Sequence, residues 1–134
     1  MTRYVIGPDV AMRLAGERAV LHPDHQMLAP ALIRSQLLSL LYQAVQRGEM
    51  TRKEADRQLD YVRGLRIRLL GDRVLQGAAW NVAERLGWPD TLATEYVALT
   101  QLHADALITL DQQFGDAARE LVTLASLEAL SRSH

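Results

Sequence analysis

The sequence predicts an α/β fold, a three-layer α/β/α sandwich whose central, mainly parallel sheet contains about four to five strands. Three observations support this prediction. Short β-prone segments alternate with segments of helical periodicity, the connections between them are short, and proline or glycine stands at several of their ends. With 134 residues and no internal repeats, the chain can build one hydrophobic core, so we expect a single domain over residues 1–134.

The first half of the chain is expected to contain one short strand and three helices. Residues 4–6 are β-prone, and Pro8 suits the first turn of a helix, where a backbone N–H is not needed. A broad apolar stripe predicts a second helix over residues 30–46. Thr51 opens a capping box, so a third helix is expected from there to Gly64.

Residues 16–26 are expected to form a loop or a short turn. Within it, His22 and His25 are three residues apart and could ligate a metal on a helical turn. Pro23 lies between them and favours a solvated turn instead.

The second half is expected to supply most of the sheet. Residues 65–70 alternate apolar side chains with arginines, the period of a half-buried strand, and an edge position would suit them. The remaining expected elements are helices at residues 73–86 and 90–100, a buried strand at 106–110, a short helix at 112–118, a strand at 121–124 and a turn at 127–130.

The composition excludes several classes of function. The chain has no cysteine, so disulfides, thiolate metal sites and a thiol nucleophile are impossible. Pro8 and Asp9 interrupt the first apolar residues before a signal sequence could form. No stretch approaches the roughly 20 apolar residues that a membrane span requires. These features predict a cytoplasmic protein without membrane contact.

Charge is unevenly distributed along the chain, although the formal net charge is only −1. Residues 47–73 carry eight basic and five acidic side chains, whereas residues 84–120 carry seven acids and two arginines. One interpretation is a basic surface for an anionic polymer beside an acidic, cation-holding pocket. The other is two solvated helix faces, and the sequence leaves both open.

Two acids follow predicted strands. Asp9 stands where the strand at residues 4–6 becomes a helix, and Asp111 ends the strand at residues 106–110. If these strands are neighbours and parallel, both acids project at the edge where open α/β sheets bind ligands. Asp90, at the head of the intervening helix, can face the same crevice.

Carboxylates that share a pocket repel one another, and a hard divalent cation such as Mg²⁺ is the usual remedy. Such a cation could activate water and neutralise the charge that develops during phosphodiester cleavage. The simpler interpretation is that Asp9 and Asp111 only cap helices.

Four segments carry further patterns, at residues 5–11, 29–36, 90–99 and 107–111. They resemble, in order, a strand followed by "D-x-S/N", a "P-x-L-x-x-x-E" helix, "D-A-x-Y-x-A-L" and "L-V-T-x-D", the signatures of the PIN-domain family and its VapC-like toxins. The resemblance covers nearly the whole chain. It implies a PIN-like sandwich, Mg²⁺- or Mn²⁺-dependent ribonuclease activity, a homodimer, and a small antitoxin that inserts a helix or tail into the active groove.

The chain departs from the family pattern at three acidic positions, which hold Gly7, Gln36 and Ala93. Asp111 falls on a matching acid. Asp9 stands two residues after the expected aspartate, at a position that also lines the pocket in the family, so it could substitute for that acid. Gln36 could orient a water or a phosphate through its amide but adds no charge.

Near Ala93, two other acids could compensate for the missing one. Glu95 is two positions away, a rotation of about 200° on a helix, so it is a weak substitute. Asp90 is one turn earlier and better aimed.

Two hypotheses follow. In the first, the protein is a ribonuclease in which Asp9, Asp90 and Asp111 hold Mg²⁺ or Mn²⁺, and Asp9, Asp111 and Gln36 act on the substrate. In the second, a PIN-like module without catalysis binds RNA or a partner protein. A phosphorelay receiver is set aside, because it needs a lysine after its last strand and the only lysine is Lys53, in a predicted helix.

Overall fold

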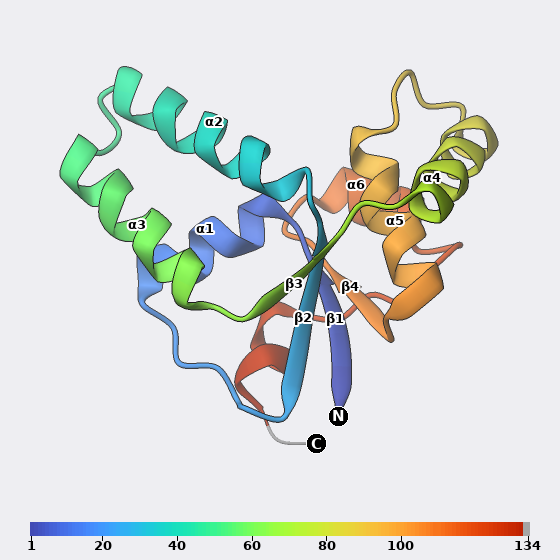
Figure 1. Cartoon of the computed structure of the whole chain (residues 1–134), viewed down its shortest axis with the longest axis horizontal. Helices are drawn as coiled ribbons and strands as arrows, with labels where there is room; N and C mark the ends of the chain where they lie inside the picture. Colours follow the sequence, from blue (N-terminus) through green and yellow to red (C-terminus); the bar gives the residue numbers. More distant parts are fainter. Residues whose placement is uncertain (133–134) are drawn as a thin grey trace.

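The computed structural model describes residues 1–132, and in this part of the chain a parallel sheet lies between two groups of helices (Figure 1). The predicted three-layer α/β/α architecture is therefore confirmed. The elements are, in chain order, β1 (Thr2–Ile6), α1 (Pro8–Glu17), β2 (His25–Pro30), α2 (Ile33–Gln46), α3 (Arg52–Gly64), β3 (Ile67–Leu70), α4 (Arg73–Leu86), α5 (Leu92–His103), β4 (Ala106–Ile108), α6 (Gln112–Ala118) and a 3-10 helix (Leu127–Ser131).

Within residues 1–132 the sheet has four strands in the order β3-β2-β1-β4, and every pairing is parallel. In β1, Val5 pairs with Leu28 of β2 and with Leu107 of β4, and all three side chains are fully buried. Helices cover both faces of these strands, which is why they are apolar rather than alternating. β3 lies at one edge, as expected for the arginine-rich segment.

The helices form two groups on opposite sides of the sheet. Figure 1 shows α1, α2 and α3 together on one side, and α4, α5 and α6 on the other. α5 packs against β1, β2 and β4, and the hydroxyl of Thr94 donates to the carbonyl of Ala79 in α4 at 2.9 Å. In the described part of the chain, no helix combines the length and apolar character needed to cross a membrane.

Side-chain caps explain where two helices begin. The Thr51 hydroxyl accepts the N–H of Glu54 at 3.1 Å, which confirms the predicted start of α3. The Asp72 carboxylate accepts the N–H of Leu75 at 2.9 Å and caps α4 in the same way. Gly87 ends α4 with a φ of 69°, a conformation that favours glycine.

The structure corrects the predicted loop at residues 16–26 and the predicted helix start at residue 30. β2 occupies His25–Pro30, pairs with both β1 and β3, and α2 begins only at Ile33. Residues 27–30 are buried between the layers. This strand contains no β-branched residue, Phe, Tyr or Trp, so the usual strand signal was missing and burial on both faces decided the conformation.

The strand predicted at residues 121–124 is also wrong. Among the described residues, this segment forms only an isolated parallel bridge between Leu107 and Leu124. The N–H of Leu107 donates to Thr123, and its carbonyl accepts from Ala125. Because β4 is only three residues long and the chain soon turns into the 3-10 helix, the pairing cannot extend.

Candidate active site

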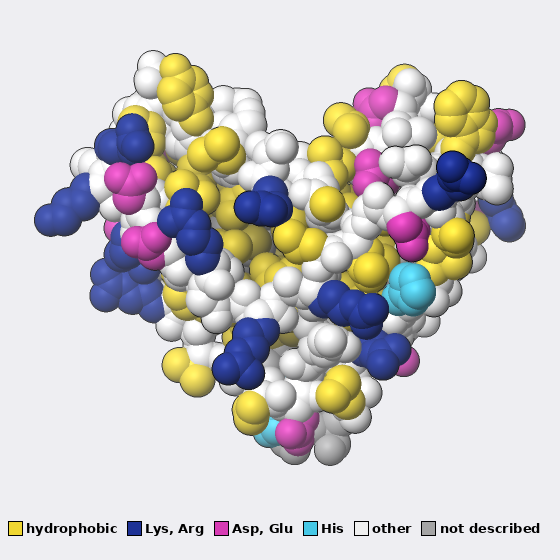
Figure 2. Space-filling view, in the orientation of Figure 1, with side chains coloured by type: hydrophobic (Ala, Val, Ile, Leu, Met, Phe, Trp, Pro, Cys, Tyr) yellow, Lys and Arg dark blue, Asp and Glu magenta, His cyan; other side chains and the backbone are white. Residues whose placement is uncertain are grey.

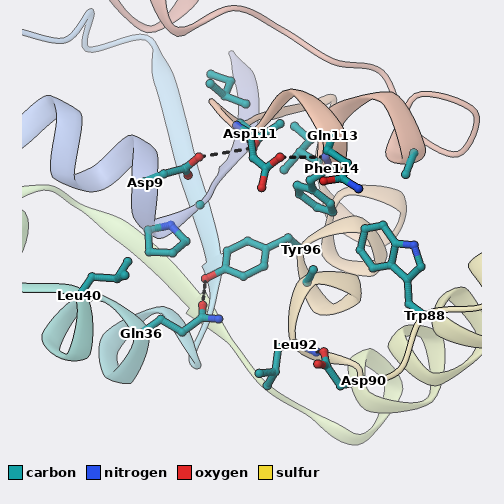
Figure 3. Close-up of a pocket in the computed structure, with 17 residues that line it drawn as sticks. Asp9, Gln36, Leu40, Trp88, Asp90, Leu92, Tyr96, Asp111, Gln113 and Phe114 are labelled. Carbon is teal, nitrogen blue, oxygen red and sulfur yellow. Dashed lines mark hydrogen bonds between the residues drawn. The ribbon is translucent and has the colours of Figure 1, made fainter. Parts of the chain in front are cut away.

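A cavity of about 590 Å³ opens at the carboxyl ends of β1 and β4 (Figure 3), where the surface is hollowed between the two groups of helices (Figure 2). Ile6 of β1 pairs with Ile108 of β4, so the two chain segments leave the sheet side by side. Asp9 and Asp111 both line the cavity, and Figure 3 shows their carboxylates on the same side of it. The structure therefore brings together the two acids that the sequence placed at strand ends.

Backbone donors from two segments hold the Asp9 carboxylate. Oδ1 accepts the N–H of Val10 at 2.8 Å, and Oδ2 accepts the N–H of Leu110 at 3.0 Å. The hydroxyl of Thr109 also faces Oδ2, at 3.5 Å. Asp9 thus ties the start of α1 to the end of β4, while Oδ1, which accepts one hydrogen bond, keeps a lone pair for another ligand.

Gly7 makes room for this position of Asp9. A Cβ atom added at Gly7 would lie 2.7 Å from Oδ1 of Asp9, closer than real Cβ contacts permit. The carboxylate of Asp9 therefore occupies space that a side chain at position 7 would need. The absence of an acid at position 7 and the presence of one at position 9 are two parts of one local arrangement.

Asp111 is held less tightly. Its Oδ1 caps α6 by accepting the N–H of Phe114 at 3.0 Å, and its own N–H donates to the Thr109 hydroxyl at 3.1 Å. The side chain is exposed, and Oδ2 has no hydrogen-bond partner among residues 1–132. Asp111 is a helix cap, as the simpler interpretation proposed, and one of its oxygens remains available at the cavity.

Asp90 also lines the cavity, but Figure 3 places it across from Asp9, beside Leu92. Its Oδ1 accepts the N–H of Leu92 at 3.0 Å, so it shapes the turn before α5. The described residues contain no group of three or more His, Asp or Glu side chains that could together hold a metal ion. Asp90 therefore does not join the pair formed by Asp9 and Asp111.

Gln36 reaches the cavity from α2, where its Oε1 accepts a 2.6 Å hydrogen bond from the hydroxyl of Tyr96. Tyr96 is 3% exposed, and burial raises the pKa of its hydroxyl, with smaller contributions from the carboxylates of Glu95 and Asp9. Tyr96 is consequently a neutral donor that fixes the Gln36 amide. It was not predicted as a site residue, although a tyrosine on the buried face of a helix needs a hydrogen-bond partner.

The other residues near Ala93 follow the helical geometry expected for α5. Ala93 lines the cavity, whereas Glu95 is not among the lining residues. Partial burial raises the pKa of the Glu95 carboxyl. Glu95 was predicted to be a weak substitute for the acid missing at position 93, and it lies away from the site.

An aromatic wall completes the cavity, and sequence reasoning missed it. Trp88, in the connection between α4 and α5, lies with its ring centroid 5.6 Å from that of Phe114, at an interplanar angle of 49°. Both rings line the cavity. The one sequence signal was a tryptophan next to Pro89, in a segment with no helical or strand period.

The two histidines of the predicted turn lie elsewhere. His25 begins β2, opposite Thr2, at the amino end of the strands and therefore at the other edge of the sheet from the cavity. The rings of His22 and His25 are 5.5 Å apart, and they belong to no metal-binding group in the described chain.

The arginine-rich segment is partly neutralised. Between residues 47 and 73, four arginines form ion pairs with acids of the same segment, namely Arg47 with Glu49, Arg52 with Asp56, Arg57 with Glu54 and Arg63 with Asp60. Arg66 and Arg68, on or beside β3, are exposed and have no ion-pair partner in residues 1–132. The paired arginines fit the interpretation as solvated helix faces, and Arg66 and Arg68, which are unpaired within residues 1–132, fit the interpretation as a basic surface for an anionic polymer.

Comparison with known proteins gives structural relatives only. No protein-family model matches the chain, and no curated protein matches its sequence. The structure is similar to that of PAE2754 from Pyrobaculum aerophilum, with a TM-score of 0.73, 16% identity, and coverage of 96% of this chain and 92% of that one.

Two complexes are also similar. VapBC2 from Rickettsia felis, solved with a DNA fragment from its promoter, gives a TM-score of 0.63 at 11% identity, covering 92% of this chain and 98% of that one. VapBC-1 from nontypeable Haemophilus influenzae gives 0.58 at 13% identity, covering 93% and 98%. At such identities the similarity establishes the fold: this chain has the PIN-like, VapC-type fold that its sequence motifs predicted.

Proposed function

We propose that this protein is a divalent-metal-dependent ribonuclease, comparable to the toxin component of a VapBC-type toxin–antitoxin system. The observation that carries the proposal is the pair Asp9 and Asp111, which line one cavity at the carboxyl edge of a parallel sheet. The reaction is hydrolysis of an RNA phosphodiester. Water adds to phosphorus, one P–O bond breaks, and the products carry a phosphate and a hydroxyl.

A divalent cation suits this pair of carboxylates. Mg²⁺ is usually bound through one or two carboxylates and keeps several of its waters. Among the described residues, Oδ2 of Asp111 has no partner and Oδ1 of Asp9 accepts only the N–H of Val10, so this Asp9 oxygen retains a lone pair. When bound there, Mg²⁺ or Mn²⁺ would supply an activated water and charge neutralisation at the phosphate.

Gln36 would position the substrate. Because the Tyr96 hydroxyl donates to Oε1, the two hydrogens of Nε2 stay available, and no residue in the described chain accepts them. An amide held in this way can donate to a phosphate oxygen but cannot attract a cation by charge. Gln36 is therefore assigned to the phosphate rather than to the metal.

A second candidate is a PIN-like module that binds RNA or a protein without cleaving. Gly7, Gln36 and Ala93 favour it, because each stands where the family pattern has an acid. Fewer carboxylates mean weaker electrostatic attraction for a divalent cation.

Partners are proposed on the same grounds. Two similar structures are VapBC complexes, so a small antitoxin-like protein is a candidate partner, as is a second copy of this chain. Arg66 and Arg68 are candidate contacts for the RNA backbone, because they are exposed and carry charge that no acid in residues 1–132 pairs with.

Mn²⁺ binding, measured by the loss of the free-ion EPR signal, separates the two candidates. We expect the wild type to bind Mn²⁺, and Asp9→Asn and Asp111→Asn each to weaken binding at least about tenfold. Asparagine caps helices as well as aspartate does, so Asp111→Asn should keep α6 intact.

The matched control is Asp116→Asn, an exposed acid of α6 that pairs with Arg119. It should bind Mn²⁺ like the wild type. A wild-type protein that retains RNA but neither binds Mn²⁺ nor cleaves would replace the ribonuclease with the non-cleaving module.

A further inference from the structure

The side of the cavity formed by Trp88 and Phe114 is aromatic and has no role in the chemistry described so far. Trp88 is half-buried and lies in the irregular connection between α4 and α5. Figure 3 shows its indole at the border of the cavity, beside Phe114. Such a ring leaves apolar surface facing the cavity, which is unfavourable unless a ligand covers it.

Trp88 and Phe114 differ in how they pack against the hydrophobic core. Phe114 belongs to the hydrophobic side chains that pack against the main core, whereas Trp88 does not. Phe114 is thus anchored to the body of the protein, and Trp88 rests against it at a centroid distance of 5.6 Å. The position of Trp88 is defined by this contact and not by a role in the core.

The aromatic wall and the acids are joined by one turn of α6. Oδ1 of Asp111 accepts the N–H of Phe114, so the phenyl ring is attached to the same helix start that carries the acid. Gln113 lies between them in the sequence, is exposed, and also lines the cavity. An RNA whose phosphodiester lies near Asp111 would therefore find an aromatic surface and an amide in the same cavity.

The dimensions fit a nucleoside. A volume of about 590 Å³ is well within the range of roughly 300–1,000 Å³ seen for small-ligand pockets. The ring of Trp88 can accept the face of a flat heterocycle, and the amide of Gln113, which also lines the cavity, can bond to the edge of that heterocycle.

We infer that Trp88, supported by Phe114, is a stacking platform for one unpaired nucleobase of RNA, next to the phosphate that Gln36 and a cation at Asp9 and Asp111 would hold. The inference rests on the proposed function, because it takes RNA as the ligand. A paired base in a helix does not expose its face, so the platform selects single-stranded RNA. Stacking tolerates any base, and Gln113 is the residue that would introduce a preference.

Tryptophan fluorescence tests this directly once Trp88 is the sole tryptophan. The other one, Trp80, is 63% exposed, bonds to Glu84 and does not line the cavity, so Trp80→Phe should leave the site unchanged. This variant is titrated with a single-stranded RNA octamer in Mn²⁺, and with the same octamer carrying abasic positions. Emission is recorded by stopped flow, at times before cleavage products can be detected on a gel, because a change at the 2′ position of the sugar does not block attack by water.

We expect the octamer to quench Trp88 emission and the abasic octamer to quench it little. Stacking contributes about 1–3 kcal/mol per base, so Trp88→Leu should weaken binding of the octamer roughly 5- to 150-fold. Trp88→Phe should retain most of the affinity, and neither change should lower Tm much, because Trp88 lies outside the core.

Binding of the octamer without quenching, with equal affinity in Trp88→Leu and equal affinity for the abasic octamer, would overturn the stacking platform and leave RNA as the ligand. No binding of RNA by the wild type at any Mn²⁺ concentration would overturn the proposed function itself, and the platform with it. The two failures are therefore distinguishable.

Discussion

The ends of β1 and β4 lie side by side and each presents one acid, yet the two acids are held in different ways. Asp9 is half-buried and accepts N–H groups from both α1 and the segment after β4, in space that Gly7 leaves open. Asp111 is exposed, caps α6 with one oxygen and keeps the other unpartnered among the described residues. Asp9 therefore also holds the framework together, whereas Asp111 contributes to the framework only by capping α6.

Gly7→Ala tests how Asp9 is held and should have the largest effect on the free energy of unfolding. The new Cβ would lie 2.7 Å from Oδ1 of Asp9, so the carboxylate has to shift, which weakens the hydrogen bonds that it accepts from Val10 and Leu110. We expect a loss of up to about 2 kcal/mol in the free energy of unfolding, measured by urea denaturation, because displacing the carboxylate cannot cost more than its hydrogen bonds contribute. The amide resonance of Leu110 should shift in the NMR spectrum.

Gly77→Ala is the matched control, because a Cβ there meets nothing within 4 Å and the residue is inside α4. It should stabilise the protein by about 0.5–1 kcal/mol through helix propensity. A Gly7→Ala protein as stable as the wild type, with an unmoved Leu110 resonance, would show that Gly7 is not needed to place Asp9.

Asp9→Ala should have an effect of similar size. It leaves two N–H groups without their carboxylate acceptor, at a half-buried position. We expect the free energy of unfolding to fall by about 2 kcal/mol. If Gly7 acts only through Asp9, then adding Gly7→Ala to Asp9→Ala should cost little more, and the double-mutant cycle in urea measures that coupling.

Asp111→Ala should cost less, about 1 kcal/mol, because it removes only the cap of α6. Asp111→Asn should cost almost nothing, since asparagine caps equally well. Equal destabilisation by Asp9→Ala and Asp111→Ala in thermal unfolding would contradict the difference drawn between the two strand ends.

The smallest effect is expected far from both strand ends, at Glu54 of α3. Its hydrogen bond with Arg57 lowers the pKa of Glu54 from 4.5 to about 2. Because the folded-state pKa is lowered, this pair stabilises the protein above about pH 4.5, and the contribution is lost as the pH falls through 2.

Glu54→Gln should therefore lower Tm modestly at pH 7, because the pair is only half-buried and solvent screens it in part, and the difference in Tm should shrink as the pH falls toward 2. Differential scanning calorimetry at the two pH values checks this. Glu120→Gln, an exposed glutamate without an ion pair in residues 1–132, is the control and should show no such pH dependence. If the Tm difference between the wild type and Glu54→Gln grew toward low pH, the result would contradict a lowered pKa of Glu54 in the folded state.

Much of the fold could be predicted from local signals. The strands that become β1 and β4, the cap at Thr51 and the edge position of β3 follow from periodicity and from a capping box. β2 could not be predicted in this way, because its apolar residues have no strand-like composition and become a strand only through pairing on both sides.

The site was predictable to a similar degree. The convergence of Asp9 and Asp111 follows from strand ends and parallel pairing. The space at Gly7 is taken by Asp9 only because of the direction of the Asp9 side chain. The contact between Trp88 and Phe114 joins two residues that are far apart in the sequence. Periodicity carries no information on either.

Cleavage of single-stranded RNA in Mn²⁺ under single-turnover conditions tests whether Asp9 and Asp111 act as one unit. We predict that Asp9→Asn and Asp111→Asn each reduce the rate at least about 100-fold, and that the double variant loses little more, because groups that act together are not additive. Cleavage by Asp111→Asn at the wild-type rate, with Mn²⁺ still bound, would contradict the assignment of this cavity as the active site.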